Sequence, residues 1–441
     1  MMRLLFTKKT LPIYFVLLAC NAQAQQPDSL LEQATLENVV QYAIKHYPLI
    51  QQSRIDEETT NYLIKSKLAD WYPQVTLFYN YQRNIQIQTS IIAGVPRALG
   101  VTNISAPQLY ATQNLFNRDV LLASKTARDV RINAKETTTS RKIDLTVNVT
   151  KAFYDVLATS QQIKVGQGDV ARLQQSLKTA QDQYNAGIVD KTDYKRATIT
   201  LRNTQANLKN NQQILNAKLE YLKSLMGYPV SEELNIMYDT LQMEKEISID
   251  TTHQVDYTSR IEYQLYQTQR RLQEASVKYN QWSFLPTVSA YGYWISSYQS
   301  DNLSDLYKTR YPNTYVGAQL TLPIFQGGKR IANIRQQKWT LKRIDWDIAN
   351  FKSTVNAQFT QALSVYKANL NTYQTLKENL DLAKEVYDVI QLQYKSGIKT
   401  YLEVITAETD LRNSRINYFN ALYQVLASKI DLQKALGQIN Y

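Results

Sequence analysis

The sequence predicts a mainly α-helical protein with a smaller β-structured part, built as two copies of one unit. The first observation is a repeat, because Gln183-Tyr184-Asn185-Ala186-Gly187-Ile188 returns about 210 residues later as Gln393-Tyr394-Lys395-Ser396-Gly397-Ile398. The second is the scarcity of turn residues, since 441 residues contain only 12 glycines and 10 prolines. The third is a pair of alternating, strand-like segments that follow Pro73 and Pro286, at matching places in the two copies. Together they predict long helices interrupted once per copy by a β-hairpin.

The repeat divides the chain into four parts. We assign a signal peptide to residues 1–24, a first repeat to 25–227, a connector to 228–255 and a second repeat to 256–441. The repeats also end alike, because Leu225-Met226-Gly227 answers Ala435-Leu436-Gly437. The connector contains a proline and scattered acidic residues, a composition that favours a solvated linker.

The N-terminus has the three parts of a secretory signal peptide. Basic residues such as Arg3 and Lys8 precede an apolar run at 11–19, and small residues follow up to Ala24. Two processing routes are compatible with this pattern. Either the peptide is cut after Ala24, or Cys20 becomes the acylated first residue of a lipoprotein. Cys20 is the only cysteine, so neither route leaves a disulfide.

The first repeat begins with a helical pattern over Thr35–Leu68 that Pro48 interrupts. A β-hairpin at about 75–116 follows, with strands at Val75–Gln82 and Leu109–Phe116. The loop between these strands contains Gly94, Pro96, Gly100 and Pro107.

A helix without proline is then expected from Asn117 to Tyr184, which makes a rod on the order of 100 Å. Gly187 turns the chain, and a return helix is predicted over Lys191–Met226.

The second repeat follows the same plan. We expect a helix at Asp256–Gln281, a hairpin at about 288–323 with strands Val288–Gln299 and Tyr315–Pro323, a long helix at Lys329–Tyr394 and a return helix at Thr400–Leu436. One face of the long helix recurs every four and three residues, which predicts packing along a neighbouring helix. Its members are Val355, Phe359, Ala362, Tyr366, Asn369, Tyr373, Leu376, Leu380, Ala383, Tyr387, Ile390 and Tyr394.

Composition excludes several classes of protein. Mean hydropathy is −0.41, and no run of about 18 apolar residues follows the N-terminal segment, so membrane-spanning helices are not expected. The net charge of +12 is spread without a basic run, which argues against nucleic-acid binding. The two histidines, His46 and His253, lack nearby ligands, and no nucleotide-binding or nucleophile motif occurs. We expect no metal, no cofactor and no enzymatic activity.

Four predicted strands per chain cannot close a sheet, and an open sheet leaves two unpaired edges. Aromatic residues crowd the strand region, among them Trp71, Tyr72, Trp282 and Trp294. They fit either β-propensity alone or the aromatic girdle of a membrane barrel. The signal peptide favours the membrane, where open edges are not tolerated, so several chains must pool their strands. Three chains would supply twelve strands.

The chain resembles the TolC-like outer-membrane efflux proteins, or outer membrane factors, over essentially its whole mature length. The matching features are Thr35-Leu36-Glu37 leading to Tyr47-Pro48, the helix-to-strand prolines, Leu322-Pro323-Ile324-Phe325-Gln326-Gly327-Gly328, and the paired Tyr-x-x-Gly turns. Each motif is weak alone, but their order within the duplication is specific. The resemblance implies a homotrimer with a 12-stranded β-barrel in outer-membrane lipid and an α-helical tunnel in the periplasm.

The resemblance also implies partners and a function. The tunnel would dock to a periplasmic adaptor, or membrane fusion protein, and to an inner-membrane RND or ABC transporter. The chain would then be a passive exit duct for efflux or type I secretion. The alternative is a non-channel periplasmic adaptor or coiled-coil scaffold, which also contains long helical hairpins. Strand hairpins at equivalent places in both halves separate the duct from this alternative.

In the family, the periplasmic aperture lies at the two glycine turns. The resemblance assigns the gate network to Tyr394, Lys399 and Asp193, and places Glu403 on a luminal ring of acids. A second acid is usual where this chain has Thr406, so the inner ring is expected to be thinner here. Lysine at 399 also weakens the lock, because an ammonium cannot make the forked contact of arginine.

Helix capping explains some of the same residues without a gate. Thr400-Tyr401-Leu402-Glu403 has the form of a capping box, and Asp190 with Asp193 is a similar arrangement. Glu403 can therefore be a gate residue, part of a luminal ring or only a cap. At the helix tips, Gly187 and Gly397 form the turns, and Tyr184 is expected to serve packing.

Overall fold

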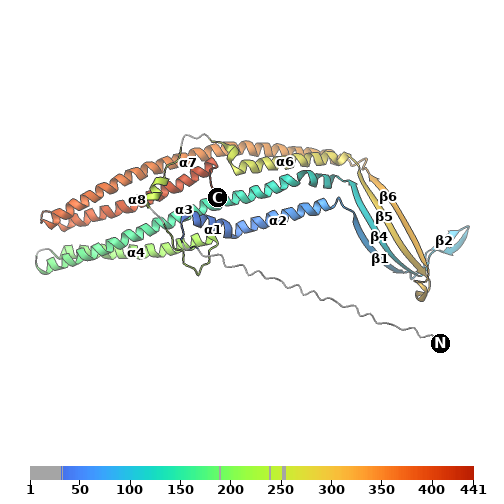
Figure 1. The fold of residues 1–441 in the computed structure, drawn as a ribbon, viewed down its shortest axis with the longest axis horizontal. Coiled ribbons are helices and arrows are strands. Elements are labelled where there is room, and N and C mark those ends of the chain that lie inside the picture. Colours follow the sequence, from blue (N-terminus) through green and yellow to red (C-terminus); the bar gives the residue numbers. More distant parts are fainter. Residues whose placement is uncertain (1–30, 32, 188–189, 238–239, 251–254) are drawn as a thin grey trace, which may run out of the picture.

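The computed structural model describes residues 31, 33–187, 190–237, 240–250 and 255–441. The predicted signal peptide at 1–24, with Cys20, and also His253 lie outside these residues. The described chain is elongated (Figure 1): two helical hairpins run side by side at one end, and a sheet lies at the other. The long helices α3 and α7 connect the two ends.

The first repeat contains four helices and two pairs of strands. Their bounds are α1 (Leu36–His46), α2 (Pro48–Ala69), β1 (Gln74–Arg83), β2 (Thr89–Ile92), β3 (Val95–Ala98), β4 (Asn103–Phe116), α3 (Arg118–Asn185) and α4 (Lys191–Met226). Pro48 opens α2 at the first helical position, where its missing N–H costs nothing. Asn117 caps α3 by accepting from the Asp119 N–H at 2.8 Å. The predicted return helix has the observed bounds of α4.

A short helix, α5 (Thr240–Glu246), precedes the second repeat. The further elements are 3₁₀ turns at Tyr257–Ser259, Trp282–Phe284 and Leu303–Asp305, with α6 (Ile261–Gln281), β5 (Thr287–Ser300), β6 (Arg310–Thr321), α7 (Lys329–Lys395) and α8 (Tyr401–Leu436). The helix expected from Asp256 begins five residues later, because Tyr257–Ser259 forms a 3₁₀ turn.

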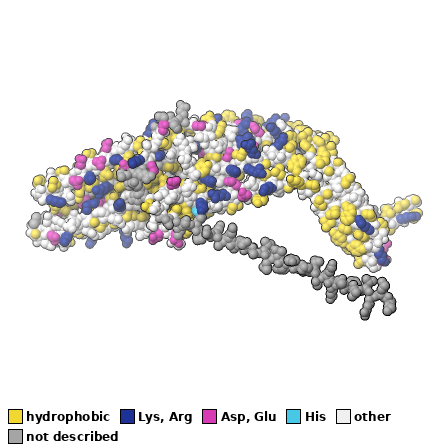
Figure 2. Space-filling view, viewed as in Figure 1, with side chains coloured by type: hydrophobic (Ala, Val, Ile, Leu, Met, Phe, Trp, Pro, Cys, Tyr) yellow, Lys and Arg dark blue, Asp and Glu magenta, His cyan; other side chains and the backbone are white. Residues whose placement is uncertain are grey.

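The four long strands make one antiparallel sheet in the order β1-β4-β5-β6. The β-hairpins of the two repeats are joined because β4 pairs with β5, where Leu109 lies opposite Trp294. Strands β1 and β6 are its edges within the described chain. Figure 2 shows hydrophobic side chains gathered over the sheet and the adjacent helix ends, whereas charged side chains are spread along the helices.

Two strand predictions were wrong at their starts. β4 begins at Asn103 rather than Leu109 and so includes Pro107, which was expected in the loop. The register with β5 passes from Ser105 to Gln108 without pairing Pro107, consistent with a residue that has no N–H to donate. β6 begins at Arg310 rather than Tyr315 and includes Pro312, which an edge strand tolerates. The small β2–β3 hairpin was not anticipated.

The core lies midway along the molecule, where helices of both repeats meet. Phe153, Leu222 and Leu422 are each 0% exposed, and they come from α3, α4 and α8. The predicted seam of α7 is confirmed there, because Tyr366 and Tyr373 are buried and other seam members pack against the same core. The burial of large side chains at this level stabilises all the long helices together.

The connector is not a solvated linker, and that prediction was wrong. Tyr228, Leu234, Met243 and Ile247 are buried in the same core. Glu244 accepts from Lys377 Nζ at 2.6 Å and from the Tyr418 hydroxyl. The acidic residues of the connector alternate with apolar ones that pack into the core, and composition alone does not show this pattern. Through Glu244 the segment contacts both α7 and α8.

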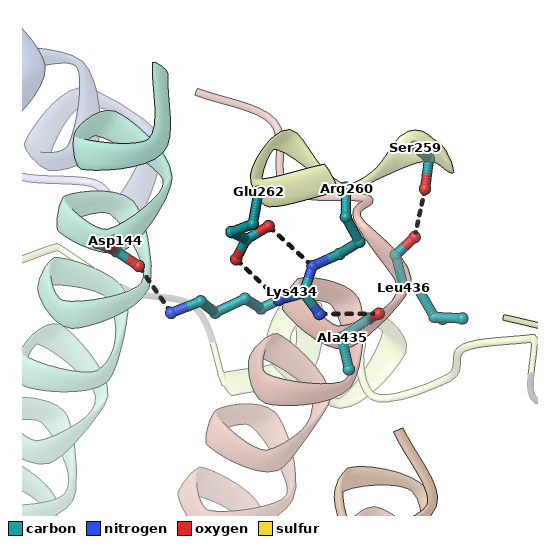
Figure 3. Close-up of polar contacts among 7 residues, drawn as sticks. All are labelled: Asp144, Ser259, Arg260, Glu262, Lys434, Ala435 and Leu436. Atoms are coloured by element: carbon teal, nitrogen blue, oxygen red, sulfur yellow. Dashed lines mark hydrogen bonds and ion pairs between the residues drawn. The ribbon is translucent and has the colours of Figure 1, made fainter. Parts of the chain in front are cut away.

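Each return helix ends against the start of its own repeat. Gly227 and Gly437 are left-handed C-caps, with φ of 66° and 72°. A Cβ added at Gly227 would lie 2.8 Å from the His46 carbonyl oxygen, and one added at Gly437 would lie 2.6 Å from Ser259 Oγ. In Figure 3 the Ser259 hydroxyl donates to the Leu436 carbonyl at 3.1 Å. This hydrogen bond satisfies a carbonyl that the end of α8 leaves open.

Gly227 provides a stability test with a matched control. Gly227→Ala is expected to lower the free energy of unfolding by about 2–4 kcal/mol, because left-handed strain adds to a clash with backbone. Gly187 has φ of 69°, but no described atom would lie within 4 Å of a Cβ added there, so Gly187→Ala should cost only about 1 kcal/mol. Denaturant unfolding followed by circular dichroism measures both. Equal losses of unfolding free energy in the two variants would show that the close approach of Gly227 to the His46 carbonyl does not matter for stability.

Candidate functional site

The candidate site is the pair of helix tips where α3 turns into α4 and α7 turns into α8. Gly187 has φ of 69° and Gly397 has φ of 75°, a conformation that glycine adopts without a side-chain clash. At the second tip the Ile398 N–H donates to the Gln393 carbonyl at 2.9 Å and the Gly397 N–H to the Tyr394 carbonyl at 2.9 Å. Both glycines therefore serve as the turns that the sequence predicted.

Tyr394 joins the two hairpins. Its hydroxyl donates to Oε1 of Gln183 at 3.0 Å, which ties the end of α7 to the end of α3. Its ring lies 6.0 Å from the ring of Tyr401. Tyr401 is buried with Ala180 and Ala197, so residues of α3, α4 and α8 form a small apolar cluster beside this bond. Burial, with a smaller contribution from Glu408, raises the pKa of Tyr401 and keeps its hydroxyl protonated.

Lys399, in the turn before α8, contacts the first turn of that helix rather than the other hairpin. Its ammonium lies 2.7 Å from Oε1 of Glu403, four residues on. Oε2 of Glu403 accepts from the Thr400 N–H at 2.9 Å and from the Thr400 hydroxyl at 3.0 Å. The predicted capping box is therefore present. The Lys399 hydrogen bond, with the Thr400 backbone bond, lowers the pKa of Glu403 to about 2, so this carboxylate is ionised throughout the ordinary pH range.

Asp193 is half-buried in the first turn of α4, which Asp190 caps by accepting from the Thr192 N–H at 3.3 Å. The expected contacts of Asp193 with Tyr394 and Lys399 do not occur within the part of the chain that the structure describes. Tyr394 bonds instead to Gln183 at the end of the neighbouring helix α3, and Lys399 bonds to Glu403 four residues farther along the chain. Asp193 does lie close enough to Tyr401 to contribute to raising its pKa.

Two further predicted residues make contacts within their own hairpins. The Thr406 hydroxyl is exposed and donates to the Leu402 carbonyl at 2.9 Å. The ring of Tyr184 stacks on Tyr194 at 6.4 Å, as expected of a packing residue.

Sequence reasoning missed Gln183, although glutamine precedes the Tyr-x-x-Gly motif in both copies. It also missed a cluster of charges with two buried carboxylates farther along the hairpins. There Arg172 of α3 contacts Asp169 and Glu408. Asp169 and Arg172 are one helical turn apart, whereas Glu408 lies 236 residues after Arg172. No sequence motif links the three.

The described part of the chain contains no group of three or more histidine, cysteine, aspartate and glutamate side chains placed to hold a metal ion. None of its helices combines the length and apolar character that crossing a membrane requires.

An open sheet at one end, two long helical hairpins at the other and glycine tips define the class of outer-membrane channel proteins with a helical tunnel. The chain belongs to the family described as outer membrane efflux protein, whose model matches residues 39–228 and 263–438. This match covers both halves of the chain.

Individual relatives agree with this family. The chain is 22% identical over 429 residues to "Outer membrane protein TolC" of Escherichia coli, covering 93% of this chain and 84% of the relative. Among solved structures, the Campylobacter jejuni CmeC outer membrane channel superimposes with a TM-score of 0.73 at 16% identity, covering 91% of this chain and 85% of that one. VceC of Vibrio cholerae superimposes with a TM-score of 0.70 at 14% identity, covering 91% and 96%.

The protein is accordingly an outer-membrane channel of the efflux and secretion class, with its helical part in the periplasm. The adaptor or scaffold alternative is not favoured, since the matching proteins are channels.

Proposed function

We propose that this chain works as a homotrimeric, passive exit duct of a tripartite efflux or type I secretion system. The observation that carries the proposal is the open four-stranded sheet with edges β1 and β6, attached to two hairpins of matching length. Pairing of β6 in one copy with β1 in the next would remove every edge after three copies and make twelve strands. The family contains channels rather than enzymes, and we assign no chemical step to this chain.

The helices next to these edges have complementary surfaces. α7 exposes Trp339 and Trp346, which are 66% and 68% exposed and seven residues apart. α2 exposes Ile55 and Tyr62, which are 64% and 65% exposed and also seven residues apart. Because β6 leads into α7 and α2 leads into β1, pairing the edges would set these stripes side by side at similar depths below the sheet.

Charge supports the same contact. On α7, the exposed basic residues Lys338 and Lys342 lie beside and between the two tryptophans. On α2, the acidic run Asp56-Glu57-Glu58 lies between Ile55 and Tyr62. Opposite charge flanking matched apolar stripes favours one register of two copies over others.

A double variant tests this contact. Trp339→Glu with Trp346→Glu places two carboxylates in the proposed interface, so we expect loss of the trimer and of planar-bilayer conductance. Light scattering in detergent measures the assembly. Leu303→Glu, a change at an exposed apolar residue beyond the sheet, is the control and should leave both unchanged. A conducting trimer that tolerates the double change would remove α2 and α7 from the interface.

We assign the gate to the helix tips. Closure is supported by the Tyr394–Gln183 bond between hairpins, while Lys399 and Glu403 hold the second turn in shape. Asp193 and Thr406 would face partners contributed by other copies. A periplasmic adaptor docking at the tips would separate the hairpins, and an inner-membrane RND or ABC transporter would supply the energy. Related proteins bear names from both systems, "Toluene efflux pump outer membrane protein TtgC" and "Alkaline protease secretion protein AprF".

A further inference from the structure

Two buried carboxylates and one half-buried arginine tie the first hairpin to the second, apart from the glycine tips. Arg172, on α3, donates to Oδ1 of Asp169 one turn earlier on the same helix. Its Nε also donates to Oε1 of Glu408 on α8, at 3.3 Å. One guanidinium therefore spans the contact between α3 and α8.

Both carboxylates have lost nearly all contact with water. Asp169 is 0% exposed and Glu408 is 4% exposed. Oδ2 of Asp169 accepts no hydrogen bond within the described chain. An ionised carboxylate with an oxygen that neither water nor a donor reaches is destabilised relative to its protonated form.

The surroundings of the cluster do not compensate for this loss. Arg412 and Arg415 of α8 act on Asp169, and Tyr387 of α7 lies close enough to Glu408 for this carboxylate to contribute to raising the pKa of the tyrosine. Tyr401, on α8, is influenced by Glu408 in the same way. α4 reaches the cluster through Thr204, whose hydroxyl accepts from Arg412 at 3.2 Å.

Burial is the largest effect on both acids and outweighs the attraction of the arginines. It raises the pKa of Asp169 and of Glu408 above the ordinary carboxyl value, and the negative charge of Asp169 adds to the effect on Glu408. When the helices part, water reaches both groups and the reason for the shift disappears.

We propose that Asp169, Arg172 and Glu408 form a pH-responsive latch between the two helical hairpins, which tightens on acidification and loosens as the pH rises. The latch lies apart from the glycine tips and uses none of their residues.

The sign of the pH effect follows from the linkage between proton binding and closure of the contact. A carboxyl whose pKa is higher in the closed contact than in the parted, solvated one binds protons more strongly when closed. Lowering the pH through the raised pKa therefore stabilises the closed contact, and raising it favours separation. This is the reverse of an exposed ion pair such as Lys399–Glu403, which is lost when its carboxylate is protonated.

The latch itself requires only the contact of α3 with α8. Its effect on passage through the channel rests on the proposed function, because the duct would then be harder to open at acidic pH. The two claims can fail separately if the separation of the hairpins and the conductance are measured on the same protein.

Spin labels at the tips report that separation directly. Ala186→Cys and Ser396→Cys place labels on exposed residues of the first and second tips, and Cys20 contributes no free thiol under either predicted processing route. Mixed trimers with unlabelled chains in excess restrict the signal to one chain. We expect the distance distribution of the wild-type latch to become shorter and narrower between about pH 8 and about pH 5.

Variants identify the groups responsible. Asp169→Asn with Glu408→Gln imitates the protonated latch, so the distances should stay short at both pH values. Asp410→Asn is the matched control on α8, because it removes an exposed carboxylate two residues from Glu408 and leaves the cluster and the glycine tip intact. It should keep the wild-type response.

The outcomes are distinct. Wild-type distances that ignore pH, or lengthen on acidification, would overturn the latch, as would a response that survives in the Asp169→Asn, Glu408→Gln variant. If the distances respond but purified protein never conducts in a planar bilayer, the latch stands and the exit-duct proposal fails. If the protein conducts while the distances ignore pH, only the latch fails.

Discussion

Replacing Arg260 with glutamine is expected to lower the free energy of unfolding by about 3–5 kcal/mol, because it breaks a buried ion pair from one side. Arg260 is 5% exposed. Its guanidinium donates to both carboxylate oxygens of Glu262, at 3.0 and 2.8 Å, and to the Ala435 carbonyl at 3.3 Å (Figure 3). The change would leave a half-buried carboxylate without its cation and open the end of α8.

The neighbouring helix end adds to this expectation. Lys434 donates to Asp144 of α3 at 2.7 Å, close to the Arg260 contact (Figure 3). Loss of Arg260 would therefore loosen the place where α6, α8 and α3 meet. Denaturant unfolding in detergent, followed by circular dichroism, measures the loss.

Arg270→Gln is the matched control for that variant. Arg270 lies on α6, which Arg260 precedes, and pairs with Glu274 at 2.5 Å and Asp345 at 2.8 Å, but its side chain is 37% exposed. Exposed pairs contribute about 0–1 kcal/mol, so this change should cost far less. Similar losses in the two variants would show that burial is not the cause.

The pH dependence of the Arg260 effect has a definite sign. Burial alone would raise the pKa of Glu262, but the hydrogen bond and charge of Arg260 outweigh it and hold the pKa below the ordinary value. A lowered carboxyl pKa gives stability that is present above the ordinary value and is lost as the pH falls through the lowered one. The stability difference between wild type and Arg260→Gln should therefore shrink in acid.

The second large effect is expected at the tips. Tyr394→Phe should raise the planar-bilayer conductance of the wild-type trimer at least about tenfold, because it removes the hydroxyl that bonds α7 to Gln183 of α3. One hydrogen bond contributes about 0.5–1.5 kcal/mol. A symmetric trimer loses three such bonds at once, and about 1.4 kcal/mol corresponds to a tenfold shift in the opening equilibrium.

Two controls separate the gate from general loosening of the tip. Tyr184→Phe removes the equivalent hydroxyl of the first copy, whose ring stacks on Tyr194 within one hairpin, and should leave conductance unchanged. Lys399→Ala breaks a contact within the second hairpin and should have a smaller effect than Tyr394→Phe. Equal conductance in wild type and Tyr394→Phe would show that the Tyr394 hydroxyl does not hold the gate closed and that the side chain serves only packing.

Much of this fold follows from local rules that a sequence displays. Proline at the start of α2, asparagine before α3 and glycine after α4 set helix ends through groups within a few residues. The seam through Tyr366 and Tyr373 follows from helical periodicity. The strand starts were less accurate, because Pro107 and Pro312 indicate loops unless the ladder around them is known.

The candidate site divides in the same way. The capping box at Thr400 and Glu403 was readable because both residues lie within one turn. The partner of Tyr394 could not be predicted from the sequence, because Gln183 is about 210 residues away and approaches only when the hairpins pack. The partner of Lys399 within the chain lies only four residues away, at Glu403 in the first turn of α8, and its role in the gate stays a prediction.

By itself, the sequence determined the helices, their glycine turns, the two strand hairpins and the family, because these depend on periodicity and on residues close along the chain. Only the tertiary structure decided that the connector is buried, that Tyr394 bonds to Gln183 and that Arg172 joins Asp169 to Glu408. Those contacts arise from packing between distant helices, and the energy of a buried charge depends on everything that surrounds it.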